Sequence, residues 1–303
     1  ALPGLNFTTT TLGSAASGRA SAGNYWVLVD ADGTYNNASS TGATYPMLAS
    51  EYALKLTSGH QLQLMGLNTA ATYSLQNSIN FGNSDVWSGA GFVPVGTSTQ
   101  PFTGTFTGSA LSSGSQAACP AASGGCTISN LTINRPNQSF VGLFGASTDA
   151  VIQNVGLVGG SVTGSNYVGG LAGYNIATIS NSYATGSVTG TGKNVGGLLG
   201  GSWGPITNSY ATGSVIGNRF VGGLVGDNSG NIVNSYATGS VNGSKYLGGL
   251  VGNQSGAINN SYATGSVTGE HRVGGLVGYA QDGAINNSYA TGVVTGNNSV
   301  GGL

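Results

Sequence analysis

A short repeat fills the C-terminal part of this 303-residue chain. Two strings recur in phase with each other, at steps of 26 or 27 residues. Val-Gly-Gly-Leu begins at Val168, Val195, Val221, Val273 and Val300, with Leu-Gly-Gly-Leu at Leu247. Asn-Ser-Tyr-Ala-Thr-Gly begins at Asn181, Asn208, Asn234, Asn260 and Asn287. A period of this length indicates a repeat architecture, in which each unit buries its apolar face against its neighbours.

The residues inside one repeat favour short strands. β-Branched residues stand between glycine-rich segments, and no stretch shows sustained 3.6-residue periodicity. Three short strands per repeat would form one coil of a parallel β-helix, with successive coils about 4.8 Å apart. Backbone hydrogen bonds would run between coils, and identical side chains would stack on one another. We therefore predict an all-β chain, a parallel β-solenoid with coils of about 26 residues.

Two bends are predicted inside each coil. Val221 and Val225 would share one face of a strand, whereas Leu224 would point to the other face. We expect the Gly-Gly pair between them to turn a corner, so that all three side chains reach the core. The phase of the apolar residues also switches between Tyr183 and Ala184, where we expect a second bend.

The sequence divides the chain into three segments. Residues 1–100 are non-repetitive and are expected to cap the first coil, with a short helix that begins after Ser58. Residues 101–140 would form the first coils and carry a cysteine hairpin, and residues 141–303 would form the regular shaft. Because Leu303 falls inside a seventh copy, we expect the chain to be a segment of a longer protein.

Composition excludes several classes of protein. Charged residues make up 5% of the chain, and the formal net charge is −1. Seven Lys and Arg residues cannot coat a nucleic-acid-binding surface. Seven prolines are too few for collagen, although 56 residues are glycine. Gly, Ser, Thr or Asn interrupts every apolar run, so we expect no transmembrane segment.

The repeats resemble the GLUG-motif repeats of large bacterial surface exoproteins. The patterns Gly-Gly-Leu-Val-Gly and Asn-Ser-Tyr-Ala-Thr-Gly-x-Val carry the resemblance, and blocks outside the repeats extend it in order along the chain. These blocks are Tyr25–Gly33, Tyr45–Tyr52, Gln61–Met65, Gly91–Gly96, Phe102–Phe106 and Ile128–Pro136. The chain is similar to filamentous-haemagglutinin-like adhesins secreted by the two-partner route. This resemblance implies a β-helical shaft, export to the cell surface, and a role in adhesion or biofilms.

Both cysteines lie in an insertion that departs from the family pattern, Ser109 to Cys126. Cys119 and Cys126 are separated by six residues in a loop of Ser, Ala, Gly and Pro. In an exported protein we expect them to form a disulfide. A metal pair or two free thiols stay open as alternatives, although a metal site needs further Cys or His ligands nearby. A hairpin pinned in this way could also be a binding tip.

Asp30 and Asp32 are weak candidates for a metal site. The segment Asp30-Ala31-Asp32-Gly33 loosely resembles a calcium loop. An EF-hand loop places its glycine at the sixth position, however, and here glycine is fourth. A tight turn between two strands explains the segment better, so we expect no metal and no cofactor.

Basic residues of the repeats share one position, two residues before the Val or Leu that opens Gly-Gly-Leu. This position should stack as one column on one edge of the shaft: Lys193, Arg219, Lys245 and His271. One interpretation is a solvated turn whose long polar side chains keep the surface soluble. The other is a basic stripe that binds an anionic polysaccharide or a lipid headgroup. Asp227, Glu270 and Asp282 lie close enough in the repeat to dilute such a stripe.

Tyrosine and asparagine form the most regular columns. The tyrosine column is Tyr183, Tyr210, Tyr236, Tyr262 and Tyr289, and the asparagine column is Asn181, Asn208, Asn234, Asn260 and Asn287. Stacked aromatic and amide ladders stabilise parallel in-register arrays. An exposed tyrosine row could instead bind sugar rings or pack against another shaft, and the sequence leaves its orientation open. A second, patchier aromatic column contains Tyr167, Phe220 and Tyr246.

A catalytic role is not expected. The acidic residues are scattered, and His-Glu-x-x-His and a phosphate loop are absent from the sequence. We predict a structural and adhesive segment of a bacterial surface adhesin, secreted or located at the cell surface. Its expected partners are more of the same shaft or other copies of the chain, with a surface glycan as a further candidate and no nucleic acid. The alternative is a self-assembling extracellular filament subunit whose solenoids stack end to end.

Overall fold

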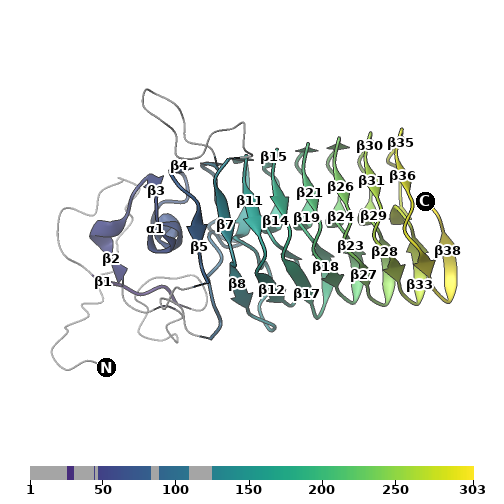
Figure 1. The fold of residues 1–303 in the computed structure, drawn as a ribbon, viewed down its shortest axis with the longest axis horizontal. Helices are drawn as coiled ribbons and strands as arrows, with labels where there is room; N and C mark the ends of the chain where they lie inside the picture. Colours follow the sequence, from purple (N-terminus) through teal and green to yellow (C-terminus); the bar gives the residue numbers. More distant parts are fainter. Residues whose placement is uncertain (1–25, 31–43, 45–46, 83–88, 109–124) are drawn as a thin grey trace.

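Strands of two to four residues, joined by glycine-rich turns, make up nearly all of the regular structure. A computed structural model of the chain describes residues 26–30, 44, 47–82, 89–108 and 125–303. Successive strands at the same repeat position pair in parallel, so the chain winds into coils stacked along one axis (Figure 1). Paired positions lie 26 or 27 residues apart in sequence. The predicted parallel β-solenoid is therefore confirmed.

Each regular coil contributes one strand to each of five sheets. Sheet 1 contains β13 (Val168–Gly169), β18 (Lys193–Gly196), β23 (Arg219–Gly222), β28 (Lys245–Gly248), β33 (His271–Gly274) and β38 (Asn298–Gly301). Sheet 2 contains β9 (Phe144–Ser147), β14 (Ala172–Asn175), β19 (Leu199–Ser202), β24 (Val225–Asn228), β29 (Val251–Gln254) and β34 (Val277–Ala280).

The other three sheets follow along the coil and extend further towards the N-terminus. Sheet 3 contains β3 (Lys55–Leu56), β4 (Thr72–Leu75), β6 (Thr105–Thr107), β10 (Val151–Gln153), β15 (Thr178–Ser180), β20 (Ile206–Thr207), β25 (Ile232–Val233), β30 (Ile258–Asn259) and β35 (Ile285–Asn286). Sheet 4 contains β5 (Ile79–Asn80), β7 (Thr127–Ser129), β11 (Gly156–Val158), β16 (Tyr183–Ala184), β21 (Tyr210–Ala211), β26 (Tyr236–Ala237), β31 (Tyr262–Ala263) and β36 (Tyr289–Ala290). Sheet 5 contains β8 (Thr132–Asn134), β12 (Ser161–Gly164), β17 (Ser187–Gly190), β22 (Val215–Ile216), β27 (Val241–Asn242), β32 (Val267–Thr268) and β37 (Val294–Thr295).

The prediction of three strands per coil was wrong, because each coil turns more corners than the sequence pattern revealed. The Gly-Gly corner is confirmed: β23 ends at Gly222, and β24 begins at Val225. Val221, Leu224 and Val225 are all fully buried. The corner therefore brings into the core both the two valines, which share one strand face, and Leu224, which alternation would place on the other. A Cβ added to Gly223 would collide with the backbone oxygen of Gly249 in the next coil. Only glycine therefore allows the coils to approach this closely at the corner.

The second bend lies at Asn181, not between Tyr183 and Ala184. Asn181 adopts a left-handed backbone with a φ of 49°, a region that Asn tolerates better than most residues. The turn leaves Ser182 buried. Tyr183 and Ala184 then belong to one strand, β16, with the tyrosine half-buried and the alanine buried. Their opposite burial is ordinary alternation along a strand.

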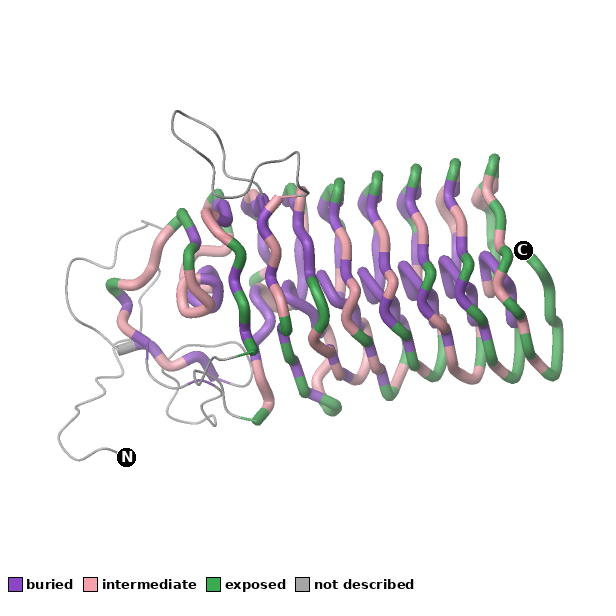
Figure 2. The backbone as a smooth tube through the Cα atoms, in the orientation of Figure 1, coloured by how far each residue is buried: buried purple, intermediate pink, exposed green. Residues whose placement is uncertain are grey.

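The core is a stack of identical or similar apolar side chains inside the coils. Figure 2 shows buried positions that recur along the backbone from coil to coil. One column of sheet 3 shows the pattern, since Ile206, Ile232 and Ile258 pair in register and are fully buried. The alanines beside the tyrosines of sheet 4 and the valines of sheet 5 complete the same interior. This stacking buries the apolar face that a single coil would leave exposed.

The described residues before residue 101 add strands to the solenoid, and their expected role as a cap stays a prediction. β3, β4 and β5 precede residue 101 and continue the parallel ladders of sheets 3 and 4. The antiparallel pair β1 (Trp26–Val27) and β2 (Met47–Leu48) lies in the same region. So do α1 (Gly59–Leu64) and the 3-10 turns η1 (Ala49–Glu51) and η2 (Met65–Leu67). Among the described residues, the helices are too short to cross a bilayer.

The predicted helix after Ser58 is confirmed. Ser58 is the N-cap of α1, and its Oγ accepts a hydrogen bond from the backbone N–H of Gln61 at 3.3 Å. Leu64 of this helix packs in a small core separate from that of the coils, together with Val27, Met47 and Val93. His60 Nδ1 lies 2.6 Å from a carboxylate oxygen of Glu51 and ties α1 to η1.

Candidate functional site

The tyrosine ladder runs along sheet 4 and faces outward. It consists of Tyr183, Tyr210, Tyr236, Tyr262 and Tyr289, which are Cα partners in successive strands. Ring centroids of neighbours are 4.7, 4.7, 4.9 and 5.3 Å apart, and ring planes differ by at most 7°. Burial raises the pKa of Tyr210 and Tyr236, and the neighbouring phenols add to this. The ladder is a flat, partly exposed aromatic strip whose rings also contact each other.

The asparagine ladder stands two residues before the tyrosines, at a left-handed corner. Each of its five members, Asn181, Asn208, Asn234, Asn260 and Asn287, has a φ between 47° and 50°. Side-chain amides bond along the column, as where Asn234 Nδ2 donates to Asn208 Oδ1 at 3.2 Å. Four of the serines between Asn and Tyr are buried, and each bonds to the next coil: Ser182, Ser209, Ser235 and Ser261. Ser209 N–H, for example, donates to Ser235 Oγ at 3.1 Å. These residues hold the corner and leave little polar capacity for a ligand.

The predicted basic column is present in sheet 1. Lys193 pairs with Arg219, Arg219 with Lys245, and Lys245 with His271. All four side chains are exposed. Lys193 differs from the rest because its charge lies near the carboxylate of Asp227, whose pKa is raised by burial, and partly opposes that rise. The structure thus shows the column, while its role as an anion-binding stripe stays a prediction.

A second left-handed column lies next to the basic one, at the residue before the Val or Leu that opens each Gly-Gly-Leu string and before Val141. Its members with positive φ are Phe140, Tyr167, Asn194, Phe220, Tyr246, Arg272 and Ser299, with φ from 53° to 64°. A left-handed backbone costs an ordinary residue about 1–2 kcal/mol, and a bulky side chain there is a genuine outlier. In the asparagine ladder, by contrast, the left-handed position is occupied by Asn in every regular coil. Sheet 1 instead places phenylalanine, tyrosine and arginine there.

Those bulky side chains form a cluster with the basic column, here called the cation–aromatic patch. It consists of Arg219, Phe220, Lys245, Tyr246, Arg272 and Tyr279. The rings of Phe220 and Tyr246 stack with centroids 4.9 Å apart. Tyr246 is the centre of the patch, because Arg219 Cζ, Lys245 Nζ and Arg272 Cζ lie 5.1, 5.0 and 5.1 Å from its ring centroid. Arg272 also lies 4.9 Å from the ring of Tyr279, which joins the patch from sheet 2. These distances are those of cation–π interactions.

The positive charges of the patch are not neutralised by nearby carboxylates. None of Arg219, Lys245 and Arg272 forms an ion pair with an acidic residue in the described part of the chain. Glu270 and Asp282, the acids closest to Arg272 in sequence, are exposed, and Asp227 is the acid closest in sequence to Arg219 and Lys245. Lys245 and Arg272 are exposed, Phe220 and Tyr246 are half-buried, and 37% of Tyr279 is exposed. The patch therefore presents rings and free cations side by side.

Towards the N-terminus, the same face becomes polar and then purely aromatic. Asp227 accepts hydrogen bonds from Asn253 Nδ2 at 2.7 Å and from Asn194 Nδ2 at 3.3 Å. Burial raises the pKa of the Asp227 carboxyl group, and these two donors and Lys193 oppose the rise. Beyond it, Tyr174 and Trp203 pack with centroids 4.8 Å apart. The cationic residues are thus concentrated at one end of the face.

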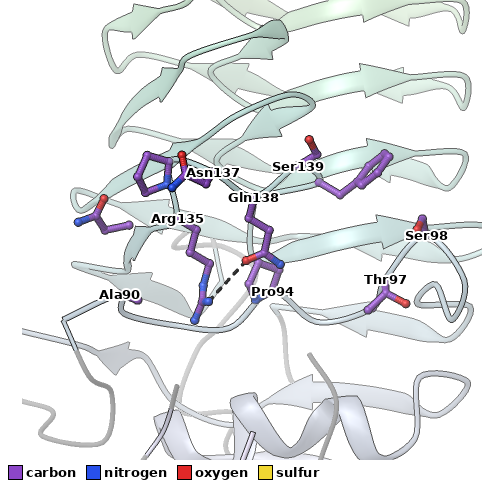
Figure 3. A pocket seen from close by; sticks show the side chains of 12 residues that line it. Ala90, Pro94, Thr97, Ser98, Arg135, Asn137, Gln138 and Ser139 are labelled. Atoms are coloured by element: carbon purple, nitrogen blue, oxygen red, sulfur yellow. Dashed lines mark hydrogen bonds between the residues drawn. The ribbon is translucent and has the colours of Figure 1, made fainter. Parts of the chain in front are cut away.

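A cavity of about 580 Å³ lies where the N-terminal region meets the first coils (Figure 3). Pro94 and Gln138 line it, together with Arg135, whose side chain is largely buried. Arg135 Nε donates to the backbone oxygen of Phe92 at 3.2 Å, and Nη2 donates to that of Gly91 at 3.4 Å. Burial lowers the pKa of Arg135 to about 10. These bonds hold residues 91–92 against the first coils, which is a structural role.

Two of the predicted sites depend on residues outside the described ranges. Cys119 and Asp32 lie outside them, so the disulfide and the weak metal site stay predictions. Cys126 is fully buried, and its backbone N–H donates to the oxygen of Gly108 at 2.8 Å. This bond closes the base of the insertion. Asp30 is also buried.

Sequence reasoning missed Arg272 and Tyr279 as members of the patch. If side chains alternated strictly along β33, Arg272 would point to the other face of the strand from the exposed His271. The left-handed backbone at Arg272, with φ of 53°, overrides that rule. The signal was available in part, because Arg272 occupies the same repeat position as Phe220 and Tyr246.

Comparison with known proteins identifies the repeats and the fold. The family profile described as the GLUG motif matches residues 164–189, 191–216, 243–268 and 269–295. The chain is also 39% identical over 94 residues to halomucin of Haloquadratum walsbyi, a stretch that covers 30% of this chain. That stretch is 1% of the length of halomucin, so the chain corresponds to a very small part of it. The chain therefore contains GLUG-motif repeats.

Two solved structures share the fold. One is the 1.30 Å crystal structure of a protein described as an immunoglobulin A1 protease from Bacteroides ovatus, with a TM-score of 0.59 and 21% identity. The match covers 80% of this chain and 77% of the other. The second is described as IgA1 protease, with a TM-score of 0.53 and 17% identity, over 86% of this chain and 21% of the other. At these identities the likeness concerns the fold alone.

Proposed function

We propose that this chain is a rigid shaft segment of an extracellular bacterial adhesin. It would both hold other parts of the adhesin away from the cell and bind a surface itself. The observation that carries the proposal is the regular ladder of coils, in which the same repeat positions pair from coil to coil in all five sheets. A stack of this kind is extended and uniform, and it presents each outward side chain as a row along its length. Such rows suit attachment to an extended surface or polymer.

The cellular location is part of the proposal. The low charge and the Asn-, Ser- and Thr-rich outer positions support export. The resemblance of the repeats and of the preceding blocks to filamentous-haemagglutinin-like proteins supports it further. Immunoblotting of intact cells of the source organism, with and without added protease, tests it. Loss of the signal on protease treatment is expected, and a fully protected signal would contradict export.

The adhesive role is tested with the whole chain coupled to microspheres. Under shear flow, coated beads should detach from surfaces that carry immobilised polysaccharides more slowly than beads coated with an inert protein. Surfaces of neutral and acidic polysaccharides, and supported lipid bilayers, are compared in the same flow cell. Equal detachment from every surface would remove the adhesive half of the proposal and leave the structural half.

We propose in addition that the chain has no catalytic activity. In the described part of the chain, His, Cys, Asp and Glu side chains do not gather in groups of three or more that could hold a metal ion. The two structural relatives are described as IgA1 proteases, so the sharpest test uses that substrate. Incubation of the chain with human IgA1 should leave the heavy chain intact on a denaturing gel. Cleavage would overturn this part of the proposal.

A further inference from the structure

We infer that the cation–aromatic patch is a binding site for an acidic polysaccharide, one that carries carboxylate or sulfate groups on its sugar rings. The inference rests on the proposed adhesive role and names the ligand class for it. Two independent features support it, the unneutralised charges and the unusual backbone at the patch.

The charges and rings match the two chemical faces of an acidic sugar. Arg219, Lys245 and Arg272 offer donors to an anionic group, and none of them is engaged by a carboxylate of the described residues. Tyr279, of which 37% is exposed, offers ring surface to the apolar C–H face of a sugar, while Tyr246 holds the three cations around its ring. Arg219 and Lys245 are Cα partners in neighbouring strands, so their charges repeat at the strand spacing of about 4.8 Å along the shaft. A linear polymer of charged sugars could follow this row.

The backbone at the patch points to a use for its side chains. Phe220, Tyr246 and Arg272 all stand at left-handed positions, with φ of 53°, 60° and 53°. Asn194 occupies the same column with φ of 64° and shows that asparagine satisfies this corner. The asparagine ladder shows the same in sheet 4. Strained backbone of this kind is retained where the side chain serves a purpose.

An acidic polysaccharide is favoured over a lipid surface by the shape of the patch. The rings of Phe220 and Tyr246 are half-buried and lie against each other, so they do not protrude to enter a bilayer. The patch lies on the straight side of a stiff stack of coils, where a polymer chain can lie alongside it. Membrane binding is kept as one of the outcomes of the test.

The experiment measures binding of the whole chain to soluble polygalacturonate by isothermal titration calorimetry at several salt concentrations. Three comparators separate the contributions: methyl-esterified polygalacturonate, polyacrylate, and vesicles of phosphatidylserine and phosphatidylcholine. We expect saturable binding to polygalacturonate that weakens with salt and is lost on esterification. Polyacrylate should bind at least about tenfold more weakly, because it offers charge without sugar rings.

The variants test the two halves of the patch separately. Lys245→Gln and Tyr246→Asn should each weaken polygalacturonate binding about fivefold or more. Lys55→Gln is the matched control, because it removes one exposed lysine from β3, away from the patch. Tyr246→Asn should fold normally, since Asn194 already occupies the column, and an unchanged thermal midpoint checks this.

Several results would overturn the inference. They are unchanged binding in both patch variants, equal binding of polyacrylate, and patch-dependent binding to vesicles alone. The proposed adhesive role fails separately. If wild-type beads and Tyr246→Asn beads resist shear equally, the adhesive role stands and this site is wrong. If no beads resist shear while soluble polygalacturonate binds at the patch, the site stands and the adhesive role is wrong.

Discussion

At the scale of single residues, the left-handed positions decide the shape of each coil. The asparagine ladder turns one corner with a residue that accepts positive φ, and its amides bond from coil to coil. The sequence marks these positions clearly, since Asn recurs in every Asn-Ser-Tyr string. It does not reveal that Asn is the corner. Asn, Ser and Tyr are all acceptable in a strand next to a turn, and only the three-dimensional path distinguishes them.

Replacing Asn234 separates the cost of the backbone from the loss of the amide bond. Asn234→Ala and Asn234→Gly both remove the bond to Asn208, but only alanine resists a φ of 50°. We expect the alanine variant to be less stable than the glycine variant by about 1–2 kcal/mol. Urea unfolding of both variants, followed by circular dichroism, measures the difference. Equal midpoints would mean that the amide bond, and not the backbone, is what matters at this corner.

At the scale of elements, side chains of different coils bond across the ladders. Asp227 of β24 accepts from Asn194 of β18 and Asn253 of β29, and Gln281 donates to Asn253 Oδ1 at 3.2 Å. This network lies beside the patch. The sequence predicted Asp227 only as a charge that dilutes the basic column. Its partners were not predictable, because they come from sheets whose relative placement depends on the five-strand coil.

The raised pKa of Asp227 makes a prediction about stability and pH. Burial is the main cause of the rise above 3.8. A raised pKa in the folded state favours the protonated form there. The stability that protonated Asp227 contributes is complete below the pKa of the unfolded state, about 3.9. It is lost as the pH rises through the higher pKa of the folded state. The free energy of unfolding of Asp227→Asn, relative to wild type, should therefore increase as the pH rises from 3 through that range.

Urea unfolding of wild type and Asp227→Asn at half-unit steps from pH 3 to pH 7 measures this trend. A constant offset between the two proteins would reflect the changed hydrogen bonds, so the slope with pH is the quantity that matters. A relative stability of the variant that falls with pH would show that the two amide donors outweigh burial.

At the scale of the whole molecule, the repeat in the sequence was enough to predict the solenoid. It was not enough to predict the number of sheets. Val221, Leu224 and Val225 correctly indicated a corner, because three apolar residues must all reach the core. The bend predicted between Tyr183 and Ala184 was wrong. It assumed that both side chains point into the core, whereas Tyr183 is half-buried on the outer face of the same strand. The patch combines sheet 1 with sheet 2, and the sequence alone does not place Tyr279 beside Arg272.

Removal of one full coil tests whether the molecule behaves as a stack of neighbours. Deletion of residues 221–246 would bring Leu247 into register with Val195, and the ladders would continue. We expect the shortened chain to fold, with an unchanged circular dichroism signal per residue. Deletion of 221–233 is the control, because it removes about half a coil and places strands opposite turns. If both deletions lose the β-sheet signal, stability depends on more than contacts between adjacent coils.

The tyrosine ladder also gives the shaft an optical property. Five phenol rings whose neighbours are 4.7–5.3 Å apart are close enough for excitation energy to migrate from one ring to the next before emission. The rings are nearly parallel and follow one another along the shaft, so excitation would pass between neighbouring rings along the shaft axis. The same close stacking couples the electronic transitions of neighbouring rings, so the near-ultraviolet circular dichroism of the unlabelled chain should depend on how many coils remain stacked.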